Sequence, residues 1–446
     1  MYGKYLALSA LAATTQATAS NHWAVIVAGS NGYWNYRHQS DTCHAYQILK
    51  ANGYQDDHII HLAFDDIASD PSNPFPGQIF NKPTAAGTPG VDVYKNCKID
   101  YKGNTVTADN VLKVLKGDKT ASGPVLGSDE NSEVFFYFAD HGAPGLIAMP
   151  VGNYLYADQL HQAFQYMNQN KMYKKMVVYI EACESGSMFE NILENNLNIY
   201  ATTAANSQES SWGTYCSPDD MVNGKSIGSC LGDLYSVNWL EDADKAKMNT
   251  ETLQDQFKTV QTETTQSHVM QWGELDWTNL PIGDFEATGD EASAANWWKN
   301  LKHKAKEFVQ HHVEKHSDHT ARKNDMAVNS RDIKLHYLYT RVKSDPSIEN
   351  MNALQEEIKK RTDVDTRFNS LFPQHMEAIK NKTTPLPTDF ECLRTLVDAY
   401  ETHCEKMDDY SLKWVSAFVA QCEGMKSFPE GVLTTVDKIK TECTAN

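Results

Sequence analysis

Cys183 and His141 are the two side chains of this 446-residue chain whose types and positions best fit nucleophilic chemistry. Each follows an apolar run, at residues 176–186 and 133–142, and open α/β sheets bind ligands where their parallel strands end. Taken singly, the cysteine has an alternative as a buried structural thiol, and the histidine as a loop residue. Two strands that end in reactive residues favour a Cys/His pair, with the imidazole as general base and acid.

Two further features would assist such a nucleophile. Gly142 lets the backbone approach a substrate closely, and its N–H and that of Cys183 are the expected oxyanion donors. A helix that begins after Cys183 would lower the pKa of the thiol. The predicted chemistry is acyl transfer without a metal or an organic cofactor, because the histidine-rich stretch 297–319 has no matching Cys or carboxylate set for zinc.

The elements that must position these residues alternate between strands and helices. Helical stretches at 42–52 and 157–171 lie between short apolar runs, which are the expected strands: 23–29, 58–63, 133–142, 176–186 and 198–205. Runs that are apolar throughout are typical of strands buried on both faces. The predicted fold class is α/β, with an open, mostly parallel sheet flanked by helices, followed by a C-terminal all-α domain.

The chain divides into four expected segments. A signal peptide covers 1–19, with Lys4 before a short apolar stretch and an A-x-A cleavage site at 17–19. Residues 20–280 form the catalytic domain, 281–331 a linker and activation segment, and 332–446 a helical domain. We therefore expect entry into the secretory pathway, and no other segment approaches the about 20 apolar residues of a membrane helix.

Charge and cysteine usage fit a secreted protein. The formal net charge of −18 argues against binding to nucleic acid or to an anionic membrane. Nine cysteines in an oxidising compartment should pair, which leaves at least one thiol free. Cys216 and Cys230 flank a short polar loop that suits a local disulfide. The last four cysteines allow three pairings, between which the sequence does not choose: Cys392, Cys404, Cys422 and Cys443.

Six motifs in series resemble the legumain family, the asparaginyl endopeptidases also called vacuolar processing enzymes. They are SNGYWNYRHQSDTCHAYQ, YFADHG, YIEACESGSM, YATTAANSQESSWGTYC, CLGDLYSVNWLED and SHVMQ, in order between about residues 22 and 272. A thinner match continues through 327–329 to the terminal cysteines. The resemblance implies a caspase-like fold, a C-terminal prodomain acting as an intramolecular inhibitor, and protein or peptide substrates cut after asparagine.

The same resemblance implies roles for particular residues. Cys183 matches the nucleophile, His141 its partner, and Asn35 the residue that orients the histidine; the matching walls of the pocket for the P1 side chain are Arg37, Glu181, Ser211 and Asp233, with His38 beside them. An asparagine side chain presents one acceptor and two donors, which an arginine and two carboxylates can satisfy. Ionised aspartate should be repelled, whereas protonated aspartate should be weakly accepted at acidic pH. Without the family match, a structural ion pair is an equally good explanation for Arg37.

The resemblance also implies latency and self-processing in an acidic compartment, a vacuole or a lysosome. Asn324 and Asn329 match the family's processing sites. We expect protonation of the histidines at 303–319 to help loosen the prodomain, because histidine changes charge between about pH 5 and 8. Replacing those five histidines with glutamine should then raise resistance to acid activation.

Three alternatives remain open. Trp212 is followed by Gly213, where ligating relatives tend to carry a larger residue, so hydrolysis is favoured over transpeptidation. The intact Cys/His/Asn set argues against a non-catalytic storage or binding protein. A subunit of the GPI-anchor transamidase should carry a C-terminal membrane helix, and the sequence shows no apolar segment of that length, which argues against this alternative. Animal members of the family often carry an Arg-Gly-Asp motif. The matching residues here, 116–118, are Lys-Gly-Asp, so no integrin binding is expected.

Overall fold

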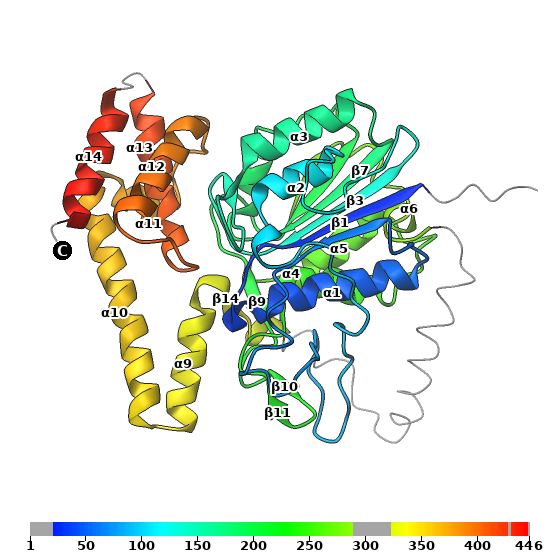
Figure 1. Cartoon of the computed structure of the whole chain (residues 1–446), viewed down its shortest axis with the longest axis horizontal. Coiled ribbons are helices and arrows are strands. Elements are labelled where there is room, and N and C mark those ends of the chain that lie inside the picture. The colour runs from blue at the N-terminus through cyan, green and yellow to red at the C-terminus, as the bar shows by residue number, and fades with distance from the viewer. Residues whose placement is uncertain (1–20, 289–322, 427–429, 445–446) are drawn as a thin grey trace, which may run out of the picture.

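The computed structural model describes residues 21–288, 323–426 and 430–444. These residues form an α/β unit and a helical unit that lie side by side (Figure 1). The signal peptide expected at 1–19 and the histidine-rich stretch at 297–319 lie outside the described residues. No helix within the described ranges is long and apolar enough to cross a bilayer.

A six-stranded sheet in the order β13-β8-β7-β3-β1-β2 is the centre of the α/β unit. Five strands are parallel and the edge strand β13 runs antiparallel to β8. The strands are β1 (His22–Ala28), β2 (Ile59–Leu62), β3 (Glu133–Ala139), β7 (Lys175–Glu181), β8 (Ile199–Thr203) and β13 (Met270–Gly273). The predicted open, mostly parallel sheet is confirmed.

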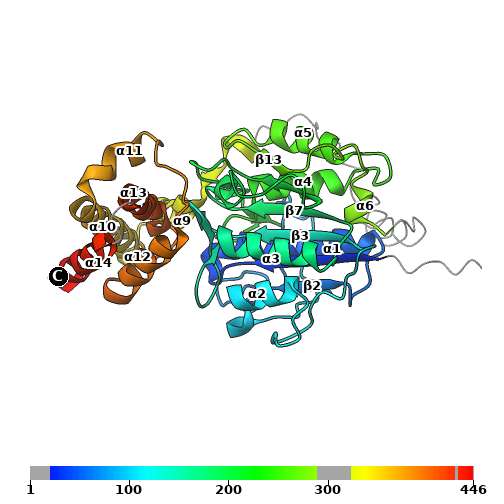
Figure 2. The same cartoon turned by 90° about the horizontal axis from the view of Figure 1, so that it is seen from above.

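Helices cover both faces of the sheet, and alternate side chains along each strand enter two separate cores (Figure 2). In β3, for example, Phe136 packs under one face and Tyr137 under the other. One face carries α2 (Ala108–Leu115) and α3 (Ala157–Gln169). The other carries α1 (Tyr36–Ala51), α4 (Leu234–Ala243), α5 (Leu253–Glu263) and α6 (Gly283–Glu286).

The helix expected at 42–52 begins six residues earlier than predicted, at Tyr36. Fifteen of the sixteen residues of α1 are buried, so the helix has no polar face and no amphipathic pattern to reveal its start. The extra turns carry Arg37 and His38 beneath the end of the sheet. A disulfide from Cys43 to Cys97 ties this helix to the long loop that follows β2.

Short strands and single-turn helices complete the α/β unit at the edge where the parallel strands end. One small sheet holds β4 (Gly142–Ala143), β5 (Leu146–Ile147) and β6 (Leu155–Tyr156), and a hairpin holds β10 (Met221–Val222) and β11 (Lys225–Ser226). A third sheet has the order β12-β9-β14, with β12 (Gly232–Asp233), β9 (Trp212–Thr214) and β14 (Val328–Asn329). Because β14 comes from the expected activation segment, residues 328–329 of that segment are part of this edge.

The helical unit packs around Phe368, Tyr400 and Phe418, and this apolar cluster continues onto Leu146 and Tyr156 of the small sheet β4-β5-β6. Its helices are α9 (Ile333–Ser344), α10 (Ile348–Leu371), α11 (Met376–Lys380), α12 (Phe390–His403), α13 (Val415–Met425) and α14 (Glu430–Thr444). The all-α prediction for this region is confirmed.

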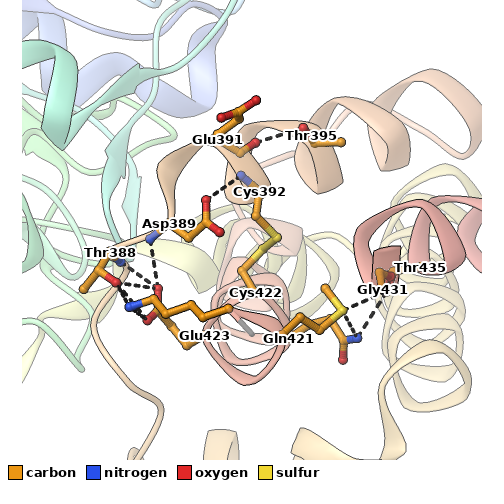
Figure 3. Close-up of a disulfide and its surroundings, with 12 residues drawn as sticks. Thr388, Asp389, Glu391, Cys392, Thr395, Gln421, Cys422, Glu423, Gly431 and Thr435 are labelled. Carbon is orange, nitrogen blue, oxygen red and sulfur yellow. Dashed lines mark hydrogen bonds and ion pairs between the residues drawn. A yellow bond between two sulfur atoms is a disulfide. The ribbon is translucent and has the colours of Figure 1, made fainter. Parts of the chain in front are cut away.

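Two disulfides join the helices of this unit, Cys392–Cys422 and Cys404–Cys443. Figure 3 shows the first bridge between α12 and α13. Beside it, Glu423 accepts hydrogen bonds from the backbone N–H groups of Thr388 (2.7 Å) and Asp389 (3.0 Å). The loop before α12 is thereby held at the end of α13.

Candidate active site

The tips of β3 and β7 bring residues 141 and 183 to the same edge of the sheet. Ala139 pairs with Glu181 in the parallel register, and the Asp140 N–H donates to the Glu181 carbonyl over 3.0 Å. A Cβ on Gly142 would lie only 2.4 Å from the Cys183 carbonyl oxygen. The two chains thus touch just beyond the strands, at a distance that only glycine permits.

His141 is buried and is oriented through its Nε2 atom. Asn35 Oδ1 lies 2.8 Å from Nε2, and because an amide oxygen can only accept, Nε2 carries the hydrogen. Nδ1 then bears the lone pair, and it has no hydrogen-bond partner among the described residues. Burial lowers the pKa of His141 to about 4, although Asp409 of the helical unit acts in the opposite direction.

The Cys183 sulfur is directed to Ser211 in this structure. It accepts from the Ser211 N–H at 3.3 Å and lies 3.6 Å from the Ser211 hydroxyl, while no hydrogen bond within the described residues joins it to His141. The expected helix after Cys183 is only a 3₁₀ turn, Ser185–Met188, preceded by Glu184 in the left-handed region (φ 48°). Burial raises the pKa of the thiol, which corrects the expectation of a thiolate favoured by a helix N-terminus.

Arg37, Glu181 and Asp233 lie together beneath this edge, all buried. Arg37 Nε donates to Asp233 Oδ1 over 2.8 Å, and Glu181 Oε2 accepts from both the backbone N–H and the hydroxyl of Ser236 at 3.0 Å. Arg37 Nη2 and Glu181 Oε1 have no hydrogen-bond partner among the described residues. One buried group of residues thus contains both an unsatisfied donor and an unsatisfied acceptor.

Two further groups complete the electrostatics of this pocket. Burial raises the pKa of Glu181 and that of Asp233, and the charge of Arg37 opposes both shifts. Asp41, from the next turn of α1, accepts from the Asp233 N–H over 3.0 Å, and burial raises its pKa as well. His38 Nε2 lies 3.4 Å from Asp233 Oδ2, which places His38 between the pocket and His141.

The chain between the two units covers the site. Val328 pairs with Gly213, and Ser330 N–H donates to the Ser211 carbonyl over 3.1 Å. Arg331, 6% exposed, donates through Nη2 to Glu184 Oε2 (2.6 Å) and to the Gly142 carbonyl (3.0 Å). A guanidinium therefore lies directly over the two strand tips.

The two candidate processing residues differ in their surroundings. Asn324 is buried, its Oδ1 accepts from the Thr265 N–H and hydroxyl (2.9 and 2.7 Å), and its Nδ2 donates to the Glu263 carbonyl (2.8 Å). Asn329 is half-buried and its Oδ1 accepts from the Arg331 N–H over 3.0 Å. The Asn329 side chain therefore caps its own turn and does not enter the Arg37 pocket.

The structure brings together every predicted catalytic and pocket residue, and it joins Cys216 to Cys230 as the spacing suggested. Of the nine cysteines, Cys183 alone is free. Sequence reasoning missed Arg331, Asp409 and Asp140. Asp140 had a signal, since it directly precedes His141 at a strand end, whereas Arg331 and Asp409 reach the site only through the packing of a distant unit.

A free cysteine and a histidine at adjacent strand tips, covered by a helical unit, are the arrangement of a cysteine peptidase made with a prodomain. The chain belongs to the Peptidase C13 family: that family's sequence model matches residues 22–288, and the model described as legumain prodomain matches residues 352–431. The predicted resemblance to legumain is confirmed.

Two named relatives are similar to this chain over most of their own length. A vacuolar-processing enzyme of Vicia sativa is 38% identical over 90% of this chain and 82% of its own. A hemoglobinase of Schistosoma mansoni is 39% identical over 86% of this chain and 83% of its own. Caspase-1 of Spodoptera frugiperda, a solved structure, is 9% identical, covers 61% of this chain and 92% of its own, and has a TM-score of 0.36.

Proposed function

We propose that this cysteine peptidase cuts peptide bonds after asparagine. The observation that carries the proposal is the pair of unsatisfied buried groups, Arg37 Nη2 and Glu181 Oε1. An asparagine side chain supplies the missing acceptor and donor at once, and an apolar side chain supplies neither. Sites built on such hydrogen bonds discriminate by factors on the order of 10⁴ or more. Aspartate fits only when protonated, so weak cleavage after aspartate belongs to acidic pH.

The proposed mechanism begins with a change at the sulfur. Once the activation segment leaves, Cys183 Sγ turns from Ser211 towards His141 Nδ1, which is free to take the thiol proton. The thiolate attacks the P1 carbonyl carbon, and the N–H groups of Gly142 and Cys183 stabilise the oxyanion. The imidazolium then protonates the leaving amine, and water hydrolyses the thioester. Asn35 keeps the ring oriented throughout.

We further propose that the chain is a zymogen with the organisation expected above: signal peptide 1–19, catalytic domain 20–280, activation segment 281–331 and inhibitory prodomain 332–446. The name vacuolar-processing enzyme, carried by the relatives, supports a vacuolar compartment, and a lysosome is the alternative. Self-processing after Asn324 or Asn329 requires that the segment first leaves its present contacts. Of the two, Asn329 lies nearer to the catalytic edge, since it pairs with Trp212.

A ligase is the second candidate, because an amine can intercept the same thioester. The test uses acid-activated protein and peptides that differ only in asparagine, glutamine or aspartate at P1, with and without an added amine. We expect cleavage after asparagine at least 100-fold faster than after glutamine. Equal cleavage of both would refute the pocket assignment, and product joined mainly to the amine would support the ligase.

A further inference from the structure

Asn381 begins the one Asn-x-Ser/Thr sequence in the entire chain, Asn381-Lys382-Thr383. An asparagine followed two positions later by serine or threonine, with any residue except proline between them, is the acceptor for N-linked glycosylation in a secreted protein. This acceptor lies within residues 352–431, the part of the chain that matches the legumain prodomain. The peptidase mechanism gives these three residues no role.

The disulfides support passage of the chain through the compartment in which such glycans are attached. Four disulfides join eight of the nine cysteines, and one of them, Cys392–Cys422, lies in the same helical unit as the acceptor. Disulfides form in oxidising compartments such as the lumen of the endoplasmic reticulum and are rare in the cytosol. The disulfides and the signal peptide expected at 1–19 therefore point to the same route.

The acceptor sequence forms a tight turn at the end of α11. Lys382 adopts the left-handed conformation (φ 54°), and its N–H donates to the Ile379 carbonyl over 3.1 Å. The Thr383 N–H donates to the Ala378 carbonyl over 2.9 Å. These two bonds close the helix as a Schellman motif, in which Asn381 is the last half-helical residue. The turn therefore fixes the backbone on both sides of the acceptor asparagine.

The side chain of Asn381 is accessible to a large group. All three residues of the acceptor sequence are exposed, and no hydrogen bond among the described residues uses the Asn381 amide. An oligosaccharide is bulky and hydrophilic, so it requires such a surface position. The next residue, Thr384, is buried, and its hydroxyl donates to Gln208 Oε1 of the catalytic unit over 2.9 Å. A glycan on Asn381 therefore lies beside the interface between the two units and leaves this contact in place.

We propose that Asn381 carries an N-linked oligosaccharide and that this glycan marks the zymogen alone. Its donor is a lipid-diphosphate-linked oligosaccharide. The Asn381 amide nitrogen bonds to the anomeric carbon of the donor, the bond from that carbon to the diphosphate oxygen breaks, and the amide proton leaves with the lipid diphosphate.

The position of the acceptor decides the fate of the glycan. Because the chain has no second acceptor sequence, every N-linked glycan departs with the prodomain on activation, a step that rests on the proposed function. A carbohydrate-binding receptor that recognises N-linked glycans therefore distinguishes the zymogen from the active enzyme.

The experiment uses the full-length Cys183→Ala zymogen made in eukaryotic cells with its own leader, so that self-cleavage does not enter the result. A glycoamidase that converts glycosylated asparagine to aspartate should remove the mass of one oligosaccharide. Asn381→Gln and Thr383→Ala, each added to Cys183→Ala, should abolish this mass loss, whereas Thr383→Ser should retain it. Peptide mass spectrometry should locate the converted residue at position 381.

Asn352→Gln is the matched control. Asn352 is an exposed asparagine of the same helical unit that begins no acceptor sequence, so its replacement should keep the full mass loss. In a second arm, the chain with Cys183 intact is activated at acidic pH and passed over a mannose-binding lectin. The lectin should retain the zymogen and the prodomain fragment and should release the active enzyme.

Three results would each overturn the proposal. They are a Cys183→Ala zymogen that loses no mass, whether recovered from the medium or from the cells, an Asn381→Gln variant that still loses it, and an active enzyme that binds the lectin through a glycan of its own. A zymogen that carries the glycan but does not cut after asparagine would instead refute the proposed function and leave the acceptor site established.

Discussion

Arg331 is the residue on which the covered state of the site depends most directly. Its guanidinium bonds to Glu184 and to the Gly142 carbonyl, and its own carbonyl accepts from Arg361 Nη2 over 2.9 Å. Truncation of one partner in a buried charged pair typically costs about 3–5 kcal/mol. Arg331 therefore contributes a buried charged contact that holds the activation segment on the catalytic domain.

We expect Arg331→Ala to activate at least about tenfold faster than the parent at one fixed acidic pH, because Glu184 is left without its partner. The measurement is the time course of peptidase activity and of chain cleavage. Arg341→Ala, an exposed arginine on α9, is the control and should activate at the parent rate. If the Arg331→Ala zymogen were activated at the same rate as the parent, this contact would not be what holds the segment in place.

The limits of sequence reasoning at this scale follow from how each residue is positioned. Cys183 and His141 follow apolar runs, so local pattern alone indicated that they share an edge of the sheet. Asn35, Arg37 and Asp233 required the family motifs, because nothing local joins residues almost 200 positions apart. Asp409 had no signal of either kind, since its contact with His141 depends on how the helical unit packs against the α/β unit.

At the scale of elements, the pairing of β14 with β9 holds the activation segment across the site. Gly213 makes the close approach possible: a Cβ there would lie 2.6 Å from Ile333 Cδ1 at the start of α9, and 3.3 Å from Cys230 Sγ. In the sequence, the same glycine favours hydrolysis over ligation. In this structure it also permits α9 to pack against β9.

Gly213→Ala should therefore loosen the segment before it affects the catalytic domain. Overpacking typically costs about 1–3 kcal/mol, so we expect activation about fivefold faster or more at one pH. Gly424→Ala is the control, because nothing lies within 4 Å of the added methyl group, and it should leave the rate unchanged. Slower activation of Gly213→Ala would contradict this account of the β9–α9 contact.

Helices and strands were easiest to predict where all their side chains have the same environment, as in strands that are buried on both faces of the sheet. β1, β3 and β7 are buried on both faces and appear as apolar runs, and all three lie where expected. The start of α1 was missed because polar residues such as Arg37 and Asp41 are buried by the site and not exposed on a solvent face. β13 was missed as a strand because all four of its residues are half-buried and no strong alternation marks it.

At the scale of the whole molecule, the catalytic unit contains buried acids that favour an acidic environment. Burial raises the pKa of Glu286, at the end of α6, to about 8, and Asp242 adds to the shift. A pKa above the ordinary 4.5 means that the folded state binds this proton more tightly than the unfolded state. The stabilisation is complete below about pH 4.5 and is lost as pH rises towards 8, by about 1.4 kcal/mol per pH unit.

Glu286→Gln, placed in the Cys183→Ala zymogen, should remove much of this dependence. Glutamine keeps an oxygen for the Gln256 amide, which donates to Glu286 Oε1 over 3.3 Å, and it never ionises. We expect the variant to unfold at a higher temperature than the parent near pH 8 and at nearly the same temperature near pH 4. Asp276→Asn, at an exposed position, is the control and should unfold at the same temperature as the parent at both pH values. Parallel curves for the Glu286 variant and its parent would contradict the prediction.

The most direct test of the central claim is a crystal structure of the activated enzyme bound to a peptide aldehyde with asparagine at P1. The account predicts a bond from Cys183 Sγ to the aldehyde carbon, with the asparagine oxygen on Arg37 Nη2 and its amide nitrogen on Glu181 Oε1. An adduct on another residue, or an asparagine side chain that points to solvent while Arg37 and Glu181 stay unpaired, would contradict it.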